Sequence, residues 1–295
     1  MSDPLHHRNP FVRKGTAAVL KVAKRIARPA GPGELRTSPP VFANSFPKSG
    51  THLLDQIVAA TPNSRNYGEF LSSMTSSFQF RRRSPTQLAG AIRASRAGEV
   101  VRAHLFYSEE VSQALRDVNA VHFFIYRDPR DVVVSEANYL RDMNRWHRLH
   151  RHFARCASFE EAVALSIRGI NGPSGGLYYP DVAQRFQDYA GWLACEDCCA
   201  VRFEGLTGAD RDTLLHEMAG FYAAKCAAPP DVEHLTAGMR SAIAPQNSHT
   251  FRSGKSGGWR AVFTPELRDL FANTTGPLLR QLGYEQDDNW VTQKT

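Results

Sequence analysis

The sequence contains no apolar run close to the roughly 18 residues that a helix needs to span a membrane. Its N-terminal 30 residues also lack the continuous apolar stretch of a signal peptide, because Lys21, Lys24 and Arg25 interrupt it. We therefore expect a cytoplasmic protein. Cysteine is scarce, and the C-x-x-C pair of Cys195 and Cys198 has no second pair that would complete a zinc site. This pattern predicts reduced thiols rather than a metal site.

Acidic residues are fewer than basic residues, which gives a net charge of +7 and a pI near 9.3. Such a charge suits nucleic acid, an anionic membrane surface or a polyanionic small molecule, and it does not choose among them. A hydrophobic share of 42% over 295 residues is enough to build a buried core. The length allows one large α/β domain or two small ones.

Residues 1–40 differ from the rest of the chain and predict an N-terminal arm with a linker. Over residues 11–28, helical spacing gathers the apolar side chains in one narrow arc: Val12, Val19, Ala23 and Ile26. Basic residues fill the opposite arc: Arg13, Lys14, Lys21, Lys24, Arg25 and Arg28. Residues 29–40 are rich in Pro and Gly and predict the linker. The helix would lie on an anionic membrane or a polyanionic partner, or would pack on its own domain with its lysines in solvent.

From residue 41 to residue 290, short β-branched or aromatic runs alternate with helical segments. This alternation predicts a single α/β domain with a central, mostly parallel sheet flanked by helices, as in P-loop NTPases. The runs that predict strands are 41–46, 99–105, 120–127 and 198–203. Helices are predicted over 51–60, 130–143, 158–169, 181–194 and 210–224, with one or two more in 263–284. The Pro-, Gly- and Ser-rich segment 229–263 predicts long loops folded over a site.

The stretch FANSFPKSGTHLLDQIVAA contains the first candidate site, in the turn between a predicted strand and a predicted helix. Backbone N–H groups from Ser49 to His52 would have no acceptor within the helix and can bind an anion. Gly50 permits close approach of the backbone, Thr51 adds a hydroxyl, and Lys48 adds a mobile charge. The motif differs from the Walker A sequence, because its lysine precedes the glycine. The alternative is an ordinary turn with a surface lysine.

The second candidate site is the stretch YRDPRDVVVS, which follows another predicted strand. Arg127 comes directly after the strand and Ser135 lies in the next helix, so that a guanidinium and a hydroxyl can bind a second phosphate. Alternatively, the charged residues of this stretch cap the helix and pair with one another: Asp128, Arg130 and Asp131.

A third cationic segment is FRSGKSGGWRAVFT at 251–264, which can wrap an anion or form a disordered surface loop. Together the three segments resemble the sulfotransferase family. FPKSGTHL resembles that family's 5′-phosphosulfate-binding loop, and YRDPRDVVVS resembles its 3′-phosphate-binding segment. FRSGKSGGWRAVFT is similar to its C-terminal R-K-G-x-x-G-D-W-K-x-x-F-T loop, and VVRAHL at 100–105 to its R-x-H-L segment. The resemblance covers roughly residues 41–285.

The resemblance implies transfer of a sulfuryl group from 3′-phosphoadenosine 5′-phosphosulfate (PAPS) to a hydroxyl or amine. Lys48 would neutralise charge on the bridging oxygen as the 5′-phosphate leaves, and His104 would be the general base. Glu69 is the alternative base, because some relatives that act on carbohydrates use a glutamate. The residues implied in donor binding are Lys48, Ser49, Gly50, Thr51, His52, Arg127, Ser135, Phe203, Arg252, Ser253 and Gly254. No metal is expected, since a sulfuryl group carries less charge than a phosphoryl group.

The chain departs from the family pattern at several positions. His52 and Leu53 stand where cytosolic members often carry Thr-Trp, whose Trp stacks on adenine, although Phe203 falls at the position of an aromatic adenine contact. In the C-terminal loop, Ser253 replaces a lysine and Gly258 replaces an aspartate. The family's dimer segment K-x-x-x-T-V-x-x-x-E survives only as scattered matches, so it gives no basis to predict a dimer.

Two other functions stay open on the sequence: a P-loop kinase, and a non-enzymatic module that binds nucleic acid or an anionic surface. We expect no nucleic-acid partner, because most aromatic residues lie inside the periodic apolar runs rather than among exposed lysines. The acceptor can be a small molecule, a sugar or a lipid-linked compound. Loops over 68–98, 141–180 and 229–250 would set its identity. Residues 11–28 are a candidate for peripheral contact with an anionic membrane.

Overall fold

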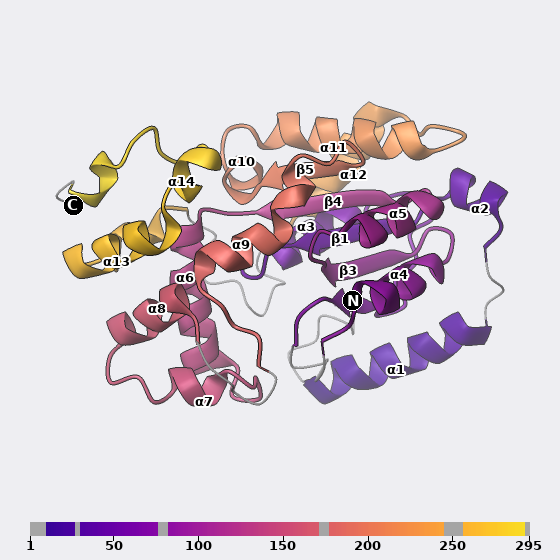
Figure 1. Ribbon diagram of the computed structural model, residues 1–295. Helices are drawn as coiled ribbons and strands as arrows, with labels where there is room; N and C mark the ends of the chain where they lie inside the picture. The colour runs from indigo at the N-terminus through magenta and orange to yellow at the C-terminus, as the bar shows by residue number, and fades with distance from the viewer. Residues whose placement is uncertain (1–9, 27–29, 76–81, 171–176, 245–255, 293–295) are drawn as a thin grey trace.

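The computed structural model describes residues 10–26, 30–75, 82–170, 177–244 and 256–292 (Figure 1). A five-stranded sheet forms its centre, with parallel pairing throughout and the order β2-β3-β1-β4-β5. The strands are β1 (Val41–Ser45), β2 (Phe70–Ser72), β3 (Val100–His104), β4 (Val121–Tyr126) and β5 (Cys198–Arg202). The four predicted strands and the predicted parallel α/β sheet are confirmed.

Helices connect the strands and cover both faces of the sheet. They are α1 (Pro10–Ile26), α2 (Pro32–Thr37), α3 (Thr51–Val58), α4 (Pro85–Arg93), α5 (Glu109–Asp117), α6 (Pro129–Asn138), α7 (His150–Phe153), α8 (Phe159–Arg168), α9 (Val182–Ala190), α10 (Phe203–Thr207), α11 (Arg211–Lys225), α12 (Val232–Ala242), α13 (Pro265–Thr275) and α14 (Leu278–Gln281). Shorter turns are the π-helical η2 (Tyr139–Met143) and the 3-10 helices η3 (Gly191–Leu193), η5 (Gly258–Ala261) and η6 (Asn289–Val291). The starts of α4, α5, α8, α9 and α13 are capped by side chains that accept backbone N–H bonds: Ser84, Ser108, Ser158, Asp181 and Thr264.

Side chains that alternate along the strands build one core on each face of the sheet. On β4, Phe123 and Ile125 join α3, α11 and α12 in one core, whereas Phe124 joins α4, α5, α6, α8, α9 and α13 in the other. Figure 1 shows β1, β3 and β4 at the centre of the molecule with these helices around them. Because the central strands are largely buried on both faces, most of their residues are apolar.

Several parts of the fold differ from the prediction. The helices α4 and α5 were not among the predicted helices, and two further differences concern the region 229–263 and the sheet edge. Residues 229–263 do not form loops throughout, because Val232–Ala242 forms α12, whose Leu235 and Met239 are buried against α3 and α11. Asp231 caps this helix by accepting a backbone N–H bond at its first turn. The second difference is β2, a three-residue edge strand that the sequence pattern does not predict.

The predicted N-terminal helix forms as α1, and it packs on the domain through its basic side. Lys24 Nζ lies 2.6 Å from Glu99 Oε1 and 3.7 Å from Glu69 Oε2, and Lys21 Nζ lies 3.3 Å from Glu69 Oε1. The alternative with solvent-facing lysines is therefore wrong for Lys24, whose side chain is 12% exposed. The predicted linker contains the short helix α2, and the boundary between arm and domain stays a prediction. None of the described helices is long and apolar enough to cross a membrane.

Candidate active site

Three candidate residues follow the carboxyl ends of three adjacent strands. β1 lies between β3 and β4, and its last residue, Ser45, is in register with Ile125 of β4. Lys48 follows β1, His104 ends β3, and Arg127 follows β4. Parallel strands end at a common edge, where ligands bind in open α/β sheets. The fold therefore brings Lys48, His104 and Arg127 to one edge of the sheet, as the sequence predicts.

The loop between β1 and α3 turns sharply. The N–H of Phe46 donates to the carbonyl of Ile125 at 3.0 Å, and the N–H of Ser49 donates to the carbonyl of Phe46 at 3.1 Å. Lys48 has a φ of +67°, a left-handed conformation that is uncommon for a residue with a Cβ and clusters at functional sites. Since α3 begins at Thr51, its first backbone N–H groups have no acceptor within the helix, which is the arrangement that binds anions at helix N-termini.

Gly50 is required by its surroundings as well as by its conformation. Its φ is +104°, in the region that favours glycine, and it precedes the first residue of α3. A Cβ at this position would lie 2.6 Å from Cδ2 of Phe203 and 3.1 Å from Cδ1 of Ile125. Phe203, the predicted adenine contact, therefore packs directly against the anion-binding loop.

The Lys48 ammonium lies beside an aromatic ring and close to other charges. Its Nζ is 3.9 Å from the centroid of the Tyr139 ring, which is a cation–π contact. Burial lowers the pKa of Lys48 to about 8, the charge of Glu136 opposes this shift, and the charge of Arg127 adds to it. Lys48 is therefore mostly protonated at neutral pH while its titration lies within reach of an ordinary pH experiment.

His104 is held in a defined tautomer. Its Nδ1 lies 2.7 Å from the carbonyl oxygen of Ser45. Because a carbonyl only accepts, Nδ1 carries the proton and donates it, which leaves the lone pair on Nε2 to accept a proton. Burial lowers the pKa of His104 to about 4, the bond to Ser45 opposes this shift, and the charges of Lys48 and Arg102 add to it. The ring of Phe70 meets the imidazole edge to face at 5.2 Å.

The Ser45 side chain connects this imidazole to the anion-binding loop. Its Oγ lies 2.7 Å from Oγ1 of Thr51 and 3.1 Å from Nδ1 of His104. One residue at the end of β1 thus links the candidate base to the first residue of α3. Sequence reasoning missed Ser45, although a polar residue at the carboxyl end of a buried strand is a usable signal.

Arg127 and the C-terminal loop meet at Asp131. The Arg127 guanidinium lies 3.3 Å from Asp131 Oδ2 and 4.5 Å from the centroid of the Phe203 ring. The same carboxylate accepts the N–H of Gly257 at 2.7 Å and the N–H of Trp259 at 2.9 Å. Asp131 therefore joins the two segments that the sequence predicts for the 3′-phosphate.

The capping interpretation of the charged residues after β4 holds for two of them. Asp128 accepts the N–H of Arg130 at 2.9 Å, and Arg130 Nη2 lies 2.8 Å from Asp128 Oδ2. Arg130 also pairs with Glu285 at 2.5 Å and stacks on the ring of Trp259 at 4.0 Å. These contacts stabilise the start of α6 and attach the C-terminal segment to it.

The structure gives the positions of only some of the other residues that are predicted to bind the donor. Ser49 is fully buried, and Thr51 and His52 open α3. Ser135 is half-buried in the second turn of α6, and Leu53 packs partly against the core of α3 and α11. Three predicted residues fall outside the described residues: Arg252, Ser253 and Gly254.

Glu69, the alternative base, lies at the opposite end of its strand from the other candidates. It precedes β2, whereas Ser72 at the carboxyl end of β2 is in register with His104. The carboxylate of Glu69 pairs with Lys21 and Lys24 of α1. The geometry therefore brings His104, and not Glu69, to the edge where the anion-binding loop lies.

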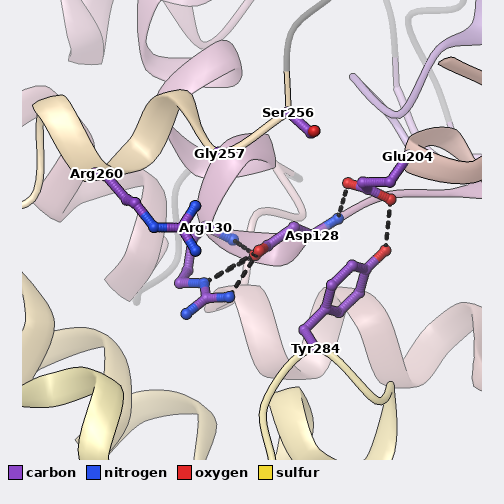
Figure 2. A pocket seen from close by; sticks show the side chains of 7 residues that line it. All are labelled: Asp128, Arg130, Glu204, Ser256, Gly257, Arg260 and Tyr284. Carbon is purple, nitrogen blue, oxygen red and sulfur yellow. Dashed lines mark hydrogen bonds and ion pairs between the residues drawn. The ribbon is translucent and has the colours of Figure 1, made fainter. Parts of the chain in front are cut away.

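A cavity of about 200 Å³ borders the C-terminal loop at Gly257 (Figure 2). Its polar groups are largely engaged with one another. Glu204 accepts the backbone N–H of Asp128 at 3.0 Å and the hydroxyl of Tyr284 at 2.9 Å. Arg260 also borders this cavity. The cavity lies beside the segments joined by Asp131.

A second cavity lies next to Lys48 and has mostly aromatic walls. Its lining consists of Phe46, Pro47, Met74, Phe106, Glu136, Arg185 and Tyr189. The rings of Phe46 and Tyr189 meet edge to face at 5.2 Å, and those of Phe106 and Tyr189 at 5.1 Å. Its volume is about 10 Å³, roughly that of one water molecule.

A buried ion pair lines this second cavity. Glu136 Oε2 lies 3.1 Å from Arg185 Nη1 and accepts the hydroxyls of Tyr179 at 2.9 Å and Ser166 at 3.1 Å. Buried charges persist when they are paired and hydrogen-bonded in this way. Sequence reasoning missed Glu136 and Arg185, because charged residues on a helix usually face solvent and nothing in the pattern marks these two as buried.

Comparison with known proteins identifies the family. A family model for the sulfotransferase domain matches residues 38–184, which contain Lys48, His104 and Arg127. The chain belongs to the sulfotransferase family. It is therefore an enzyme, and the alternatives of a P-loop kinase and of a non-enzymatic binding module are wrong. No curated protein sequence matches this sulfotransferase.

Solved structures share its fold at low sequence identity. Mouse sulfotransferase SULT7A1 complexed with PAP is 17% identical, with a TM-score of 0.54, and the match covers 95% of this chain and 93% of that one. Retinol dehydratase in complex with androsterone and the inactive cofactor PAP is 16% identical, with a TM-score of 0.52 and coverage of 85% and 82%. Retinol dehydratase in a complex with retinol and PAP is 14% identical, with a TM-score of 0.54 and coverage of 83% and 82%.

Proposed function

We propose that this sulfotransferase transfers the sulfuryl group of PAPS to an acceptor hydroxyl, with Lys48 at the leaving phosphate and His104 as general base. The observation that carries the proposal is the meeting of Lys48, His104 and Arg127 at one edge of the sheet. PAP, the bisphosphate that remains when PAPS loses its sulfuryl group, is bound in the structural neighbours, which supports PAPS as the donor. An amine acceptor would fit the same chemistry.

The donor would be held by the loop after β1 and by the groups that meet at Asp131. Backbone N–H groups at the start of α3 and the Thr51 hydroxyl would bind the 5′-phosphosulfate. Ser49 Oγ is buried and, within the described part of the chain, has no hydrogen-bond partner, so a ligand oxygen can use it. Arg127, with Ser135 and the segment 252–254, would bind the 3′-phosphate.

Lys48 and the helix N-terminus supply positive charge without a metal. In the described residues, no group of three or more His, Cys, Asp or Glu side chains is placed to hold a metal ion. That the reaction proceeds without a metal stays a prediction, based on the lower charge of a sulfuryl group compared with a phosphoryl group.

The transfer step follows from the tautomer of His104. Nε2 would take the proton from the acceptor hydroxyl while the acceptor oxygen forms its bond to sulfur. The bond between sulfur and the bridging oxygen breaks at the same time, and its electron pair stays on the 5′-phosphate of PAP. The Lys48 ammonium would neutralise the charge that grows on that oxygen. The proton then resides on His104 until it is released to solvent.

The acceptor would enter the aromatic cavity beside Lys48. Its aromatic lining suits an alcohol with an apolar body, such as a phenol or an alicyclic alcohol. Because the cavity has room for only about one water molecule in this structure, its walls would move apart to admit such an alcohol. Crystals of retinol dehydratase hold androsterone and retinol, which are alcohols of this kind. Sugar and lipid-linked acceptors are the alternatives.

Calorimetric titration with PAP tests donor binding. Wild-type protein should bind PAP, and Arg127→Ala should weaken binding by about 10- to 100-fold because a charge-assisted contact is lost. Arg211→Ala is the matched control, since it removes an exposed arginine of α11. Binding of ATP with Mg²⁺ in place of PAP would contradict the proposal.

A transfer assay with sulfur-labelled PAPS tests the reaction and identifies the acceptor class. Phenols, alicyclic alcohols, sugars and lipids would be compared under the same conditions, with Lys48→Ala as the inactive control. Labelled product is expected with the apolar alcohols. PAP binding without transfer to any compound in the panel would contradict the proposed reaction.

A further inference from the structure

The basic helix α1 presents an apolar face to solvent. Val19 is 70% exposed and Ile26 is 81% exposed, and Val12 and Val22 are exposed as well. Helical spacing places Gly15, Ala18 and Ala23 on the same side, and all three are exposed. A surface helix of a globular protein normally turns its apolar side toward the core and its charges toward water. The orientation of α1 is the reverse.

A buried ion pair holds α1 in this orientation. Glu99 is completely buried, and Lys24 Nζ lies 2.6 Å from it. Arg96 also donates from its guanidinium to the Lys24 carbonyl at 3.3 Å. Rolling the helix to bury its valines would remove Lys24 and leave the buried Glu99 carboxylate without this partner, which is strongly unfavourable. The exposed apolar face is thus a consequence of how α1 is anchored.

Charge and size argue for a lipid surface as the partner of this face. α1 contains five basic residues and no acidic residue: Arg13, Lys14, Lys21, Lys24 and Arg25. Lys21 and Lys24 pair with carboxylates of the domain, but the whole chain keeps a net charge of +7, so two copies that approach each other through α1 repel. A stripe on 17 residues is about 25 Å long and about 10 Å wide, or roughly 250 Å², far below the roughly 800 Å² per partner of a stable protein interface.

We propose that the outer face of α1, formed by Val12, Val19, Val22 and Ile26, docks this sulfotransferase on an anionic bilayer. Figure 1 shows α1 along the outer edge of the molecule, below β3 and α4, where a flat surface can reach it. The valines and Ile26 enter the boundary between head groups and acyl chains, and the net charge of +7 attracts the chain to the anionic head groups. The proposal does not depend on which donor or acceptor the enzyme uses.

Vesicle flotation with the full-length protein tests the proposal. Wild-type protein should float with vesicles of phosphatidylcholine and phosphatidylglycerol in equal parts, and less with phosphatidylcholine alone. The double variant Val19→Ser with Ile26→Ser should bind the anionic vesicles about tenfold or more weakly, because two exposed aliphatic side chains no longer enter the bilayer. Leu193→Ser, which changes an exposed leucine outside α1, should float like wild type.

Thermal melting and PAP binding of the double variant should match wild type, since neither side chain is packed in the domain. Equal flotation of the double variant and wild type would overturn the proposal. It would also be overturned by sedimentation experiments in which wild type forms a dimer, the double variant is a monomer, and neither floats with vesicles. In that case the face of α1 is an interface between two copies of the chain.

Discussion

Nδ1 of His104 lies 2.7 Å from the carbonyl oxygen of Ser45, at the point where β1 ends and the anion-binding loop begins. This single bond decides the chemistry available to the imidazole. The carbonyl accepts a hydrogen bond from the proton of Nδ1, so Nε2 is the unprotonated nitrogen and can accept a proton. Burial keeps the ring neutral by lowering its pKa to about 4. A neutral imidazole with a defined acceptor nitrogen is what removal of a proton from a hydroxyl requires.

The pKa of His104 predicts activity that persists in mild acid. The base must be unprotonated, and with a pKa of about 4 it stays so well below the range in which an ordinary histidine with a pKa near 6.5 titrates. The acid limb of kcat/KM should therefore lie near pH 4. Measuring kcat/KM against pH for an acceptor that does not itself ionise checks this. An acid limb near pH 6.5 would show that the imidazole is not buried during turnover.

Replacing each of the two candidate bases in turn shows which of them is the general base. His104→Ala should lower kcat by about 10²- to 10⁴-fold, the usual contribution of a positioned base. Glu69→Gln should retain activity close to wild type, because the Glu69 carboxylate pairs with Lys21 and Lys24 rather than facing the anion-binding loop. PAP binding should be unchanged in both variants. The opposite ranking of the two activities would assign the base to Glu69.

Lys48 predicts an alkaline limb in the same profile. The ammonium must be protonated to neutralise the leaving phosphate, and burial lowers its pKa to about 8. The value of kcat/KM should therefore fall above about pH 8. Lys48→Arg should keep part of the activity and lose this limb, because a guanidinium stays charged up to at least about pH 12. Lys48→Ala should lower kcat by about 10²- to 10³-fold at every pH. An alkaline limb that persists in Lys48→Arg would assign it to another group.

Sequence patterns predicted four of the five strands, including the edge strand β5, whose residues are mostly half-buried. β1, β3, β4 and β5 are short apolar runs between helical segments, and each was predicted to within about two residues. β2 was not predicted, because three residues at a sheet edge leave too short a pattern. The helix α12 was hidden by its flanking prolines and its many polar residues, and only its buried Leu235 and Met239 reveal its role.

The sequence could predict those residues of the candidate site that lie at the carboxyl ends of strands. A residue that follows a parallel strand must lie at the carboxyl edge, so Lys48, His104 and Arg127 could be placed together from the sequence. Contacts between distant segments could not be predicted. The bonds from Asp131 to the C-terminal loop span more than a hundred residues, and no local pattern records them. The bond from Arg96 to the carbonyl of Lys24, which helps to set the orientation of α1, joins residues 72 apart in the sequence and could not be predicted either.

The packing around Gly50 predicts that any side chain at this position lowers the free energy of unfolding. Gly50→Ala would force a left-handed alanine with its Cβ against the Phe203 ring, at a cost of about 1–3 kcal/mol, and should weaken PAP binding. Gly90→Ala is the matched control, because Gly90 lies inside α4 with open space around its Cα and should be stabilised by about 0.5–1 kcal/mol. Urea unfolding of both variants measures the difference. Equal stability of Gly50→Ala and wild type would contradict the close packing of Phe203 on this glycine.

His122 predicts the direction in which stability changes with pH. Its side chain is buried in β4 against Trp192, burial lowers its pKa to about 3, and the charge of Lys225 adds to the shift. Between this value and the unfolded value near 6.5, the unfolded chain binds the proton and the folded chain does not. The contribution of His122 to stability is therefore constant above pH 6.5 and falls by about 1.4 kcal/mol per pH unit below it.

His122→Leu removes this titration without placing a charge in the core. The difference in the free energy of unfolding between wild type and variant should shift in favour of the variant as the pH falls from about 6.5 toward 4. Urea unfolding at several pH values measures this difference, and the other titrating groups cancel because they are common to both proteins. The variant can be less stable than wild type at neutral pH, since leucine fills the site differently. A difference that stays constant over this range would show that His122 is not buried in its neutral form.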